Sequence, residues 1–71
     1  DYLKVVFERP LIKFGQAIIY NSLGQVAATY DLSAMEREYR MELNGLAPGL
    51  YFVILYIDHI PMFNSKIVVN R

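Results

Sequence analysis

Apolar and polar residues alternate along most of the chain with the period of two that a half-buried β-strand produces. Near the start, every second residue of Leu3–Phe7 is apolar, which predicts a strand with one buried face. Arg9-Pro10 interrupts this pattern, because proline has no amide hydrogen to donate to a ladder. Leu11–Phe14 could then add a short edge strand. The first 14 residues therefore predict one strand and allow a second, short one.

A hairpin between residues 16–20 and 25–30 is the most distinct local signal. The residues between these runs, Asn21-Ser22-Leu23-Gly24, have the chemistry of a type I turn followed by a left-handed glycine. The Asn21 side chain can accept hydrogen bonds from nearby backbone amides, and Gly24 can adopt a positive φ because it has no Cβ. Two antiparallel strands are predicted to meet at this turn.

The middle of the chain allows a short helix or a loop before the next strand. Ser33-Ala34-Met35-Glu36 fits a capping box, in which a serine hydroxyl and a glutamate carboxylate satisfy each other's backbone amides. Only one or two turns of helix could follow, and such short helices are marginal in isolation. Alternation resumes over residues 39–44 and predicts a strand. Gly45–Gly49 is then expected to be a turn, with Leu46 pointing inward.

The last third of the chain predicts two long strands. Leu50–Asp58 is apolar on both faces, which is typical of a central strand covered on both sides. Asp58-His59 would form the next tight reversal. Pro61 restricts the start of the final strand to an edge or another position where no amide is needed. Alternation then continues over residues 63–70.

These elements predict a single all-β domain covering residues 1–71. A chain this short cannot divide its apolar surface between two cores. Six strands, with a seventh left open, are joined by short reversals, and this pattern predicts a small antiparallel β-sandwich of six to seven strands. The alternation places in its core Val5, Ile19, Val26, Leu43, Tyr51, Val53 and Ile67.

Composition and charge exclude several classes of function. Seven basic and seven acidic residues are interspersed and cancel, so the chain lacks the basic surface that nucleic acid or anionic lipid requires. A hydrophobic fraction of 55% excludes a disordered tail. No apolar run approaches the roughly 18 residues of a membrane span, and no cysteine is present for a disulfide or a thiolate site. We expect no nucleic-acid binding and no direct membrane insertion.

Side chains suited to catalysis are few and scattered. His59 is the single histidine, and a metal site needs several convergent donors. Because His59 lies beside Asp58 in a predicted turn, we interpret it as a solvated residue. Glu36 and Glu38 lie among arginines and predict a solvated charged face. We therefore expect no enzyme activity, no metal and no cofactor.

Tyrosines are the remaining candidates for a ligand site. They could stack on sugars or bases, but in a small sandwich a tyrosine more often closes the edge of the core with its hydroxyl at the water boundary. We favour this structural role for Tyr20, Tyr30, Tyr39, Tyr51 and Tyr56.

Three stretches, Ile18–Val26, Gly45–Val53 and Lys66–Val69, together resemble a known family. In order and spacing they are similar to the C-terminal sorting domain of proteins exported by the type IX secretion system. That family usually has a strand ending in Ile-Tyr, a polar turn with Gly, a Leu-x-x-Gly-x-Tyr segment and a final Lys-x-Val-Val strand. The resemblance extends from about Leu3 to Arg71. The matching residues are Tyr20, Asn21, Gly24, Gly49, Tyr51, Lys66, Val68 and Val69.

The resemblance implies an immunoglobulin-like sandwich that serves as an address label. Family members carry an attached cargo protein from the periplasm across the outer membrane. They are typically cleaved by a sortase that links the cargo to lipopolysaccharide at the cell surface. The implied partners are type IX translocon and sortase proteins. The implied translocon contact is the terminal group Lys66, Ile67, Val68 and Val69.

Several alternatives stay open at this point. Lys66 could instead guard the edge strand against aggregation, with Ile67, Val68 and Val69 as ordinary core. Family members often begin with a Tyr-Pro-Asn-Pro segment and an ensuing strand, and neither is found in this sequence. We therefore expect this chain to be part of a longer exported protein, with an unpaired edge that could form a homodimer. The main rival function is a structural or adhesive immunoglobulin-like module, with carbohydrate binding as one form.

Overall fold

The structure, a computed structural model, describes residues 2–70, so Asp1 and Arg71 at the ends of the predicted domain lie outside the described residues. Within that range the chain forms six strands and no helix. The strands are β1 (Tyr2–Val6), β2 (Gly15–Asn21), β3 (Val26–Leu32), β4 (Glu38–Glu42), β5 (Gly49–Ile57) and β6 (Ile60–Val69).

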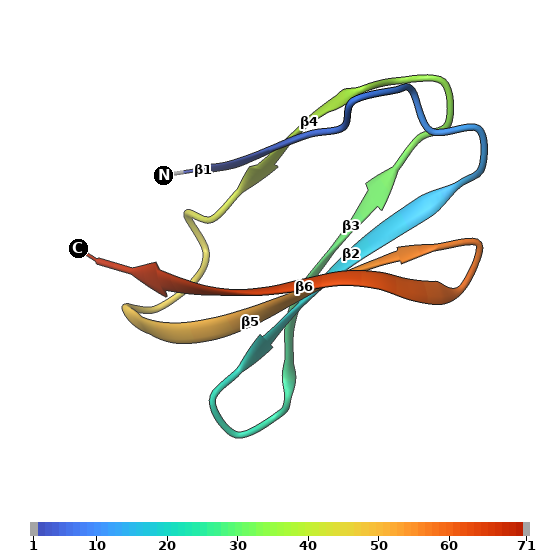
Figure 1. The fold of residues 1–71 in the computed structure, drawn as a ribbon. Coiled ribbons are helices and arrows are strands. Elements are labelled where there is room, and N and C mark those ends of the chain that lie inside the picture. Colours follow the sequence, from blue (N-terminus) through green and yellow to red (C-terminus); the bar gives the residue numbers. More distant parts are fainter. Residues whose placement is uncertain (1, 71) are drawn as a thin grey trace.

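The strands form two antiparallel sheets. β1 pairs with β4 in the smaller sheet, and the larger sheet has the order β3-β2-β5-β6. The smaller sheet lies over one face of the larger one (Figure 1). The predicted small antiparallel β-sandwich is confirmed.

The core lies between the two sheets and takes side chains from both. Its buried members are Ala17, Ile19, Leu32, Tyr39, Met41, Leu43, Leu46, Tyr51, Val53, Leu55 and Val69. Predicted core positions Ile19, Leu43, Tyr51 and Val53 are among them, and Leu46 points inward as expected. Val5 and Ile67 are partly buried against this core.

Val26 was predicted to lie in the core, and this prediction is wrong because its side chain is 59% exposed. The reason is a bulge in the β2–β3 hairpin. Ile19 pairs with Ala28, but Tyr20 pairs with Val26, so one extra residue is accommodated in β3. A bulge of this kind reverses the facing of the residues beyond it. Val26 therefore lies on the outer face beside Tyr20.

The hairpin turn itself is confirmed in detail. The Asn21 side-chain oxygen accepts hydrogen bonds from the amides of Leu23 and Gln25, each at 3.0 Å. Gly24 has a φ of 82°, a conformation that costs glycine little. The Asn21 carbonyl also accepts from the Gly24 amide at 3.0 Å. Side chain and backbone together fix the end of the hairpin.

Before β4 the structure has neither the possible edge strand nor the possible helix, and after Ser33 it has the loop that the sequence also allowed. Leu11–Phe14 forms no strand, and the Leu11 amide instead donates to the Glu36 carbonyl at 3.1 Å. No helix follows Ser33 either. Its hydroxyl does meet the Glu36 carboxylate at 2.8 Å, but Met35 has a φ of 72° and its amide donates to the Leu11 carbonyl. The two loops therefore provide hydrogen-bond partners for each other's backbone amides and carbonyls, and these groups do not require a helix.

β5 is central in its sheet, as predicted, but the expectation that both its faces are covered is wrong. Leu50 and Phe52 are 41% and 37% exposed on the side away from the smaller sheet. With two strands in the smaller sheet and four in the larger, only one face of β5 is covered among the described residues. The Asp58-His59 reversal is confirmed, with φ of 53° and 66°. Pro61 lies on β6, an edge strand as expected.

Gly15 is a structural requirement that the sequence analysis missed. A Cβ at this position would lie 2.9 Å from the Ile57 Cδ1 atom, 3.1 Å from the Tyr56 carbonyl oxygen and 3.3 Å from the Leu32 Cβ. The isoleucine terminus could move, but the carbonyl belongs to the β5 backbone. The start of β2 therefore packs closely enough that only glycine fits without a shift of the sheet.

We predict that Gly15→Ala lowers the free energy of unfolding by about 1–3 kcal/mol, because it forces extra volume against backbone. Gly45→Ala is the matched control, since a Cβ there meets nothing within 4 Å, and it should leave stability unchanged. Urea denaturation followed by circular dichroism measures both. Equal midpoints for the two variants would contradict the packing argument.

Candidate functional site

β6 is an edge strand of the larger sheet and, within residues 2–70, pairs only with β5. Its terminal residues divide between two faces. Val69 is 4% exposed and belongs to the core, and Ile67 packs against the core. Val68 is 63% exposed and Lys66 is also exposed. The predicted recognition group is therefore one continuous segment of which Lys66 and Val68 face outward.

Lys66 lies at the end of a row of side chains that crosses three strands. In the register of the sheet, Tyr20 of β2 is opposite Phe52 of β5, and Phe52 is opposite Lys66 of β6. We call Tyr20, Phe52 and Lys66 the outer row. Residues distant in the sequence thus form one surface with a cation at the edge and two aromatic rings beside it.

The outer row belongs to a larger apolar surface, the outer face of the larger sheet. Leu50 lies opposite Val68 on this face, and Ile18 lies opposite Ile54. Phe52 and Leu50 were not predicted as site residues, because β5 was expected to be covered on both faces. The number of predicted strands could have indicated this exposure. When four of six strands form one sheet, the two that are left can cover only one of its faces.

The other motif residues build the fold. Asn21 and Gly24 form the hairpin turn described above. Tyr51 is buried, and its hydroxyl donates to the Ala47 carbonyl at 2.6 Å, which ties the preceding turn to the core. Gly49 begins β5 opposite Val69, with a φ of 153°. These residues position β5 and β6 and present little surface for a partner to contact.

Tyrosine hydroxyls close the edges of the core, in keeping with the structural role favoured above. Tyr39 donates to the carbonyls of Ser33 and Glu36, the latter at 3.0 Å. Tyr30 donates to the Glu42 carbonyl. Burial, followed by the negative charge of a nearby glutamate, raises the pKa of both Tyr39 and Tyr30.

Tyr20 and Tyr56 form a second kind of tyrosine contact, on the outer face. Their hydroxyl oxygens lie 3.3 Å apart. This hydrogen bond is the main cause that raises the pKa of Tyr20, with burial second. The Tyr20 phenol therefore stays neutral at physiological pH, and the charge on the outer row comes from Lys66.

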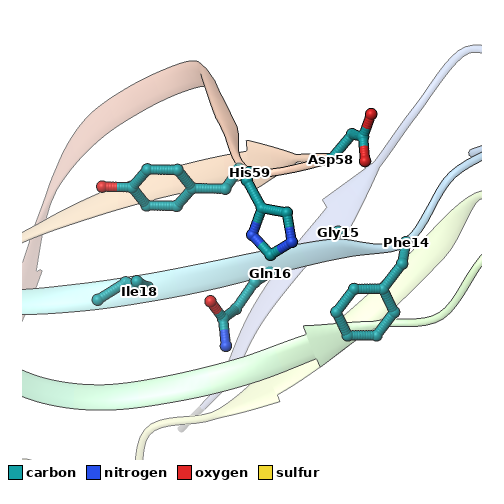
Figure 2. A pocket seen from close by; sticks show the side chains of 7 residues that line it. Phe14, Gly15, Gln16, Ile18, Asp58 and His59 are labelled. Atoms are coloured by element: carbon teal, nitrogen blue, oxygen red, sulfur yellow. The ribbon is translucent and has the colours of Figure 1, made fainter.

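A pocket of about 260 Å³ lies at one end of the outer face, lined by Phe14, Gly15, Gln16, Ile18, Tyr56, Asp58 and His59. Figure 2 shows the His59 ring over β2, near Gln16, while the Asp58 carboxylate points away from it. That carboxylate accepts from Lys13 Nζ at 3.1 Å. The pocket thus contains no histidine–carboxylate pair that could activate a nucleophile.

Residues 2–70 contain no group of three or more histidine, cysteine, aspartate or glutamate side chains placed to hold a metal ion. Over the same residues, no helix is long and apolar enough to span a membrane.

Comparison with known families decides the identity of the domain. The family described as secretion system C-terminal sorting domain has a model that matches residues 1–70. The chain belongs to this family. No curated protein and no solved structure matches the chain.

Membership confirms the resemblance seen in the sequence and fixes the general function. The chain is a C-terminal sorting signal of type IX secretion. Such a sorting domain implies contact with the secretion machinery and export to the outer-membrane surface or the extracellular space. The family is a family of signals and is not catalytic.

We predict that alkaline pH destabilises the sorting domain through Tyr39. Burial raises the pKa of Tyr39 above its ordinary value of 10.0, so the unfolded chain loses the phenolic proton more readily than the folded chain. The stability that this group contributes is complete below about pH 10 and is lost as the pH rises through the folded-state pKa. Urea midpoints measured from pH 8 upward should fall more steeply for the parent than for Tyr39→Phe.

Tyr39→Phe should also cost about 1 kcal/mol at pH 7, because the Ser33 and Glu36 carbonyls lose their donor. Tyr2→Phe at an exposed position is the control and should change stability at pH 7 by less than about 0.5 kcal/mol. Parallel curves of stability against pH for the parent and Tyr39→Phe would contradict the assignment.

Proposed function

We propose that the translocon recognises the segment Lys66, Ile67, Val68 and Val69, and that Lys66 and Val68 make the direct contact. The observation that carries this proposal is the alternation of exposure over Lys66–Val69 at the end of β6. Ile67 and Val69 support recognition by holding the strand against the core. Lys66 and Val68 are the exposed members of this segment, and a partner on the outer face can reach them without unfolding the domain.

The surroundings of Lys66 suit a protein partner. Interfaces typically place aromatic and aliphatic side chains at their centre and charged groups at their rim. Phe52 and Val68 supply apolar surface next to Lys66 at the edge of the sheet. A translocon surface with an apolar depression beside a carboxylate would match this arrangement, and the Lys66 charge would add specificity and a faster encounter.

The finer steps of the pathway are part of the proposal and rest on family membership. The domain would be the C-terminal part of a longer exported protein and would pass through the periplasm in transit. A sortase would then cleave the chain before the domain and attach the released cargo to lipopolysaccharide on the cell surface. In these steps the domain acts as an address and a substrate.

The homodimer stays a prediction. β1 and β6 each have one unpaired side, which is where a second copy could add a strand. Each of these edges has a lysine along it, Lys4 on β1 and Lys66 on β6. Like charges placed opposite one another destabilise strand pairing, so a dimer would need a register that separates the two lysines.

We predict that Lys66→Ala reduces export of a fluorescent reporter fused ahead of the domain several-fold, while the domain's unfolding free energy changes by less than about 0.5 kcal/mol. Lys13→Ala is the matched control, because Lys13 is an exposed lysine in a loop outside β6. It should leave export at the parental level. Secreted and cell-associated fluorescence in a host with a type IX system gives the readout.

Deletion of residues 66–71 should abolish export, but it also removes core residues Ile67 and Val69. The point substitution is therefore the decisive variant. Normal export of both Lys66→Ala and the truncated reporter would refute recognition through β6 and favour the adhesive module.

A further inference from the structure

A second surface, separate from the outer face, lies between the free side of β1 and β6. It is a groove of about 500 Å³ on the inner side of the larger sheet. Its floor includes Val53 and Leu55 of β5, and its sides include Val5 of β1 and Ile67 of β6. The groove exists because the smaller sheet ends at β1 and does not extend over β6.

Phe63 shows that this part of the sandwich is left open. It alternates with Ser65, Ile67 and Val69 on β6, and Val69, on the same side of the strand, is buried in the core. Phe63 is nevertheless 60% exposed. An inward-facing aromatic side chain therefore lines the groove with no strand of the smaller sheet above it.

The backbone of β1 offers hydrogen-bonding groups to this groove. The Phe7 amide donates to the Arg37 carbonyl at 2.8 Å, directly beyond the β1–β4 ladder. Alternate residues of an antiparallel strand direct their amide and carbonyl to the same neighbour. Leu3 and Val5 therefore bond with β4, whereas Lys4 and Val6 direct their backbone groups away from β4. Both also line the groove.

We propose that the groove accepts an extended segment of another protein, in which apolar residues alternate with acidic ones, as a third strand beside β1. Such a strand would lie about 4.8 Å from β1 and bond to the backbone of Lys4 and Val6. Its apolar residues would point onto Leu55, Phe63 and Ile67. Its other residues would face solvent.

Charge identifies the solvent-facing residues of the occupant. Lys4 lies directly opposite Arg40 in the smaller sheet, and its contact with Glu38 is 3.6 Å long with both side chains more than half exposed. Arg40 already bonds Glu42 at 2.8 Å. A carboxylate on the incoming strand beside Lys4 would relieve the repulsion between Lys4 and Arg40, whereas a cation would add to it.

The same charges disfavour a second copy of this chain as the occupant. In a register that sets the lysines side by side, a β6 strand from another copy would bring Lys66 beside Lys4, and a β1 strand would bring a second Lys4. Both pairings place like charges on adjacent strands. The groove is also on the opposite side of the larger sheet from the outer row, so the inference goes beyond the proposed function and can be tested without secretion.

The probe is a short capped peptide of alternating valine and glutamate, compared with one of alternating valine and lysine. Each is titrated into the isotope-labelled 71-residue chain, and amide shifts are followed by NMR. The valine–glutamate peptide should shift the Lys4 and Val6 amides most and bind about two- to fivefold more tightly than the valine–lysine peptide. Lys4→Glu should reverse that preference.

Val6→Pro tests the backbone contact, because it removes an amide that faces the groove but leaves the β4 ladder intact. It should weaken binding about tenfold, while Val6→Thr, which keeps the amide, should bind as the parent does. If Val6→Pro fails to fold by circular dichroism, Lys4→Glu decides the matter. Equal affinity for the two peptides, no shift at Lys4 and Val6, or shifts centred on the outer face would overturn the proposal. Concentration-dependent dimerisation that shifts these amides without peptide would also overturn it.

Discussion

β2 and β5 pair along their whole common length, from Gly15 with Ile57 to Asn21 with Tyr51, and the rest of the larger sheet is attached to this pair. β3 adds to the free side of β2, and β6 adds to the free side of β5. Because the pairing fixes which side chains share a face, Ile19 and Val53 point toward the smaller sheet and Tyr20 and Phe52 point away from it. A shift by one residue would exchange the two sets.

The proposed recognition of the domain depends on the same division of faces. Two strands cannot cover both sides of four, so the apolar side chains that point away from β1 and β4 stay accessible. On β6 this division separates Val69, which stabilises the sandwich, from Val68, which a partner can contact. It also leaves the groove beside β1, where Phe63 points inward without a covering strand. The proposed recognition by the secretion machinery would therefore need the intact sheet as well as the residues it exposes.

Local chemistry allowed much of the fold to be predicted from the sequence. The Asn21–Gly24 turn and Pro61 on an edge strand depend on neighbouring residues alone, and period-two alternation placed the strands. Most of the failures depend on contacts between distant segments. The contact of Leu11 with Met35 in place of an edge strand and the close approach of β5 to Gly15 have no local signal, and the bulge that turns Val26 outward has none in the alternation. The proposed recognition segment comes from family resemblance, but its division into two faces required the structure.

Unfolding free energies of Val68→Ala and Val69→Ala, measured side by side by urea denaturation, test the division of the terminal segment most directly. The two substitutions remove the same atoms from adjacent residues of one strand. Val69→Ala should cost about 2 kcal/mol, because it leaves a cavity in the core. Val68→Ala should change stability by less than about 0.5 kcal/mol. Equal losses for the two variants would contradict the claim that one residue supports the core and its neighbour is free to be recognised.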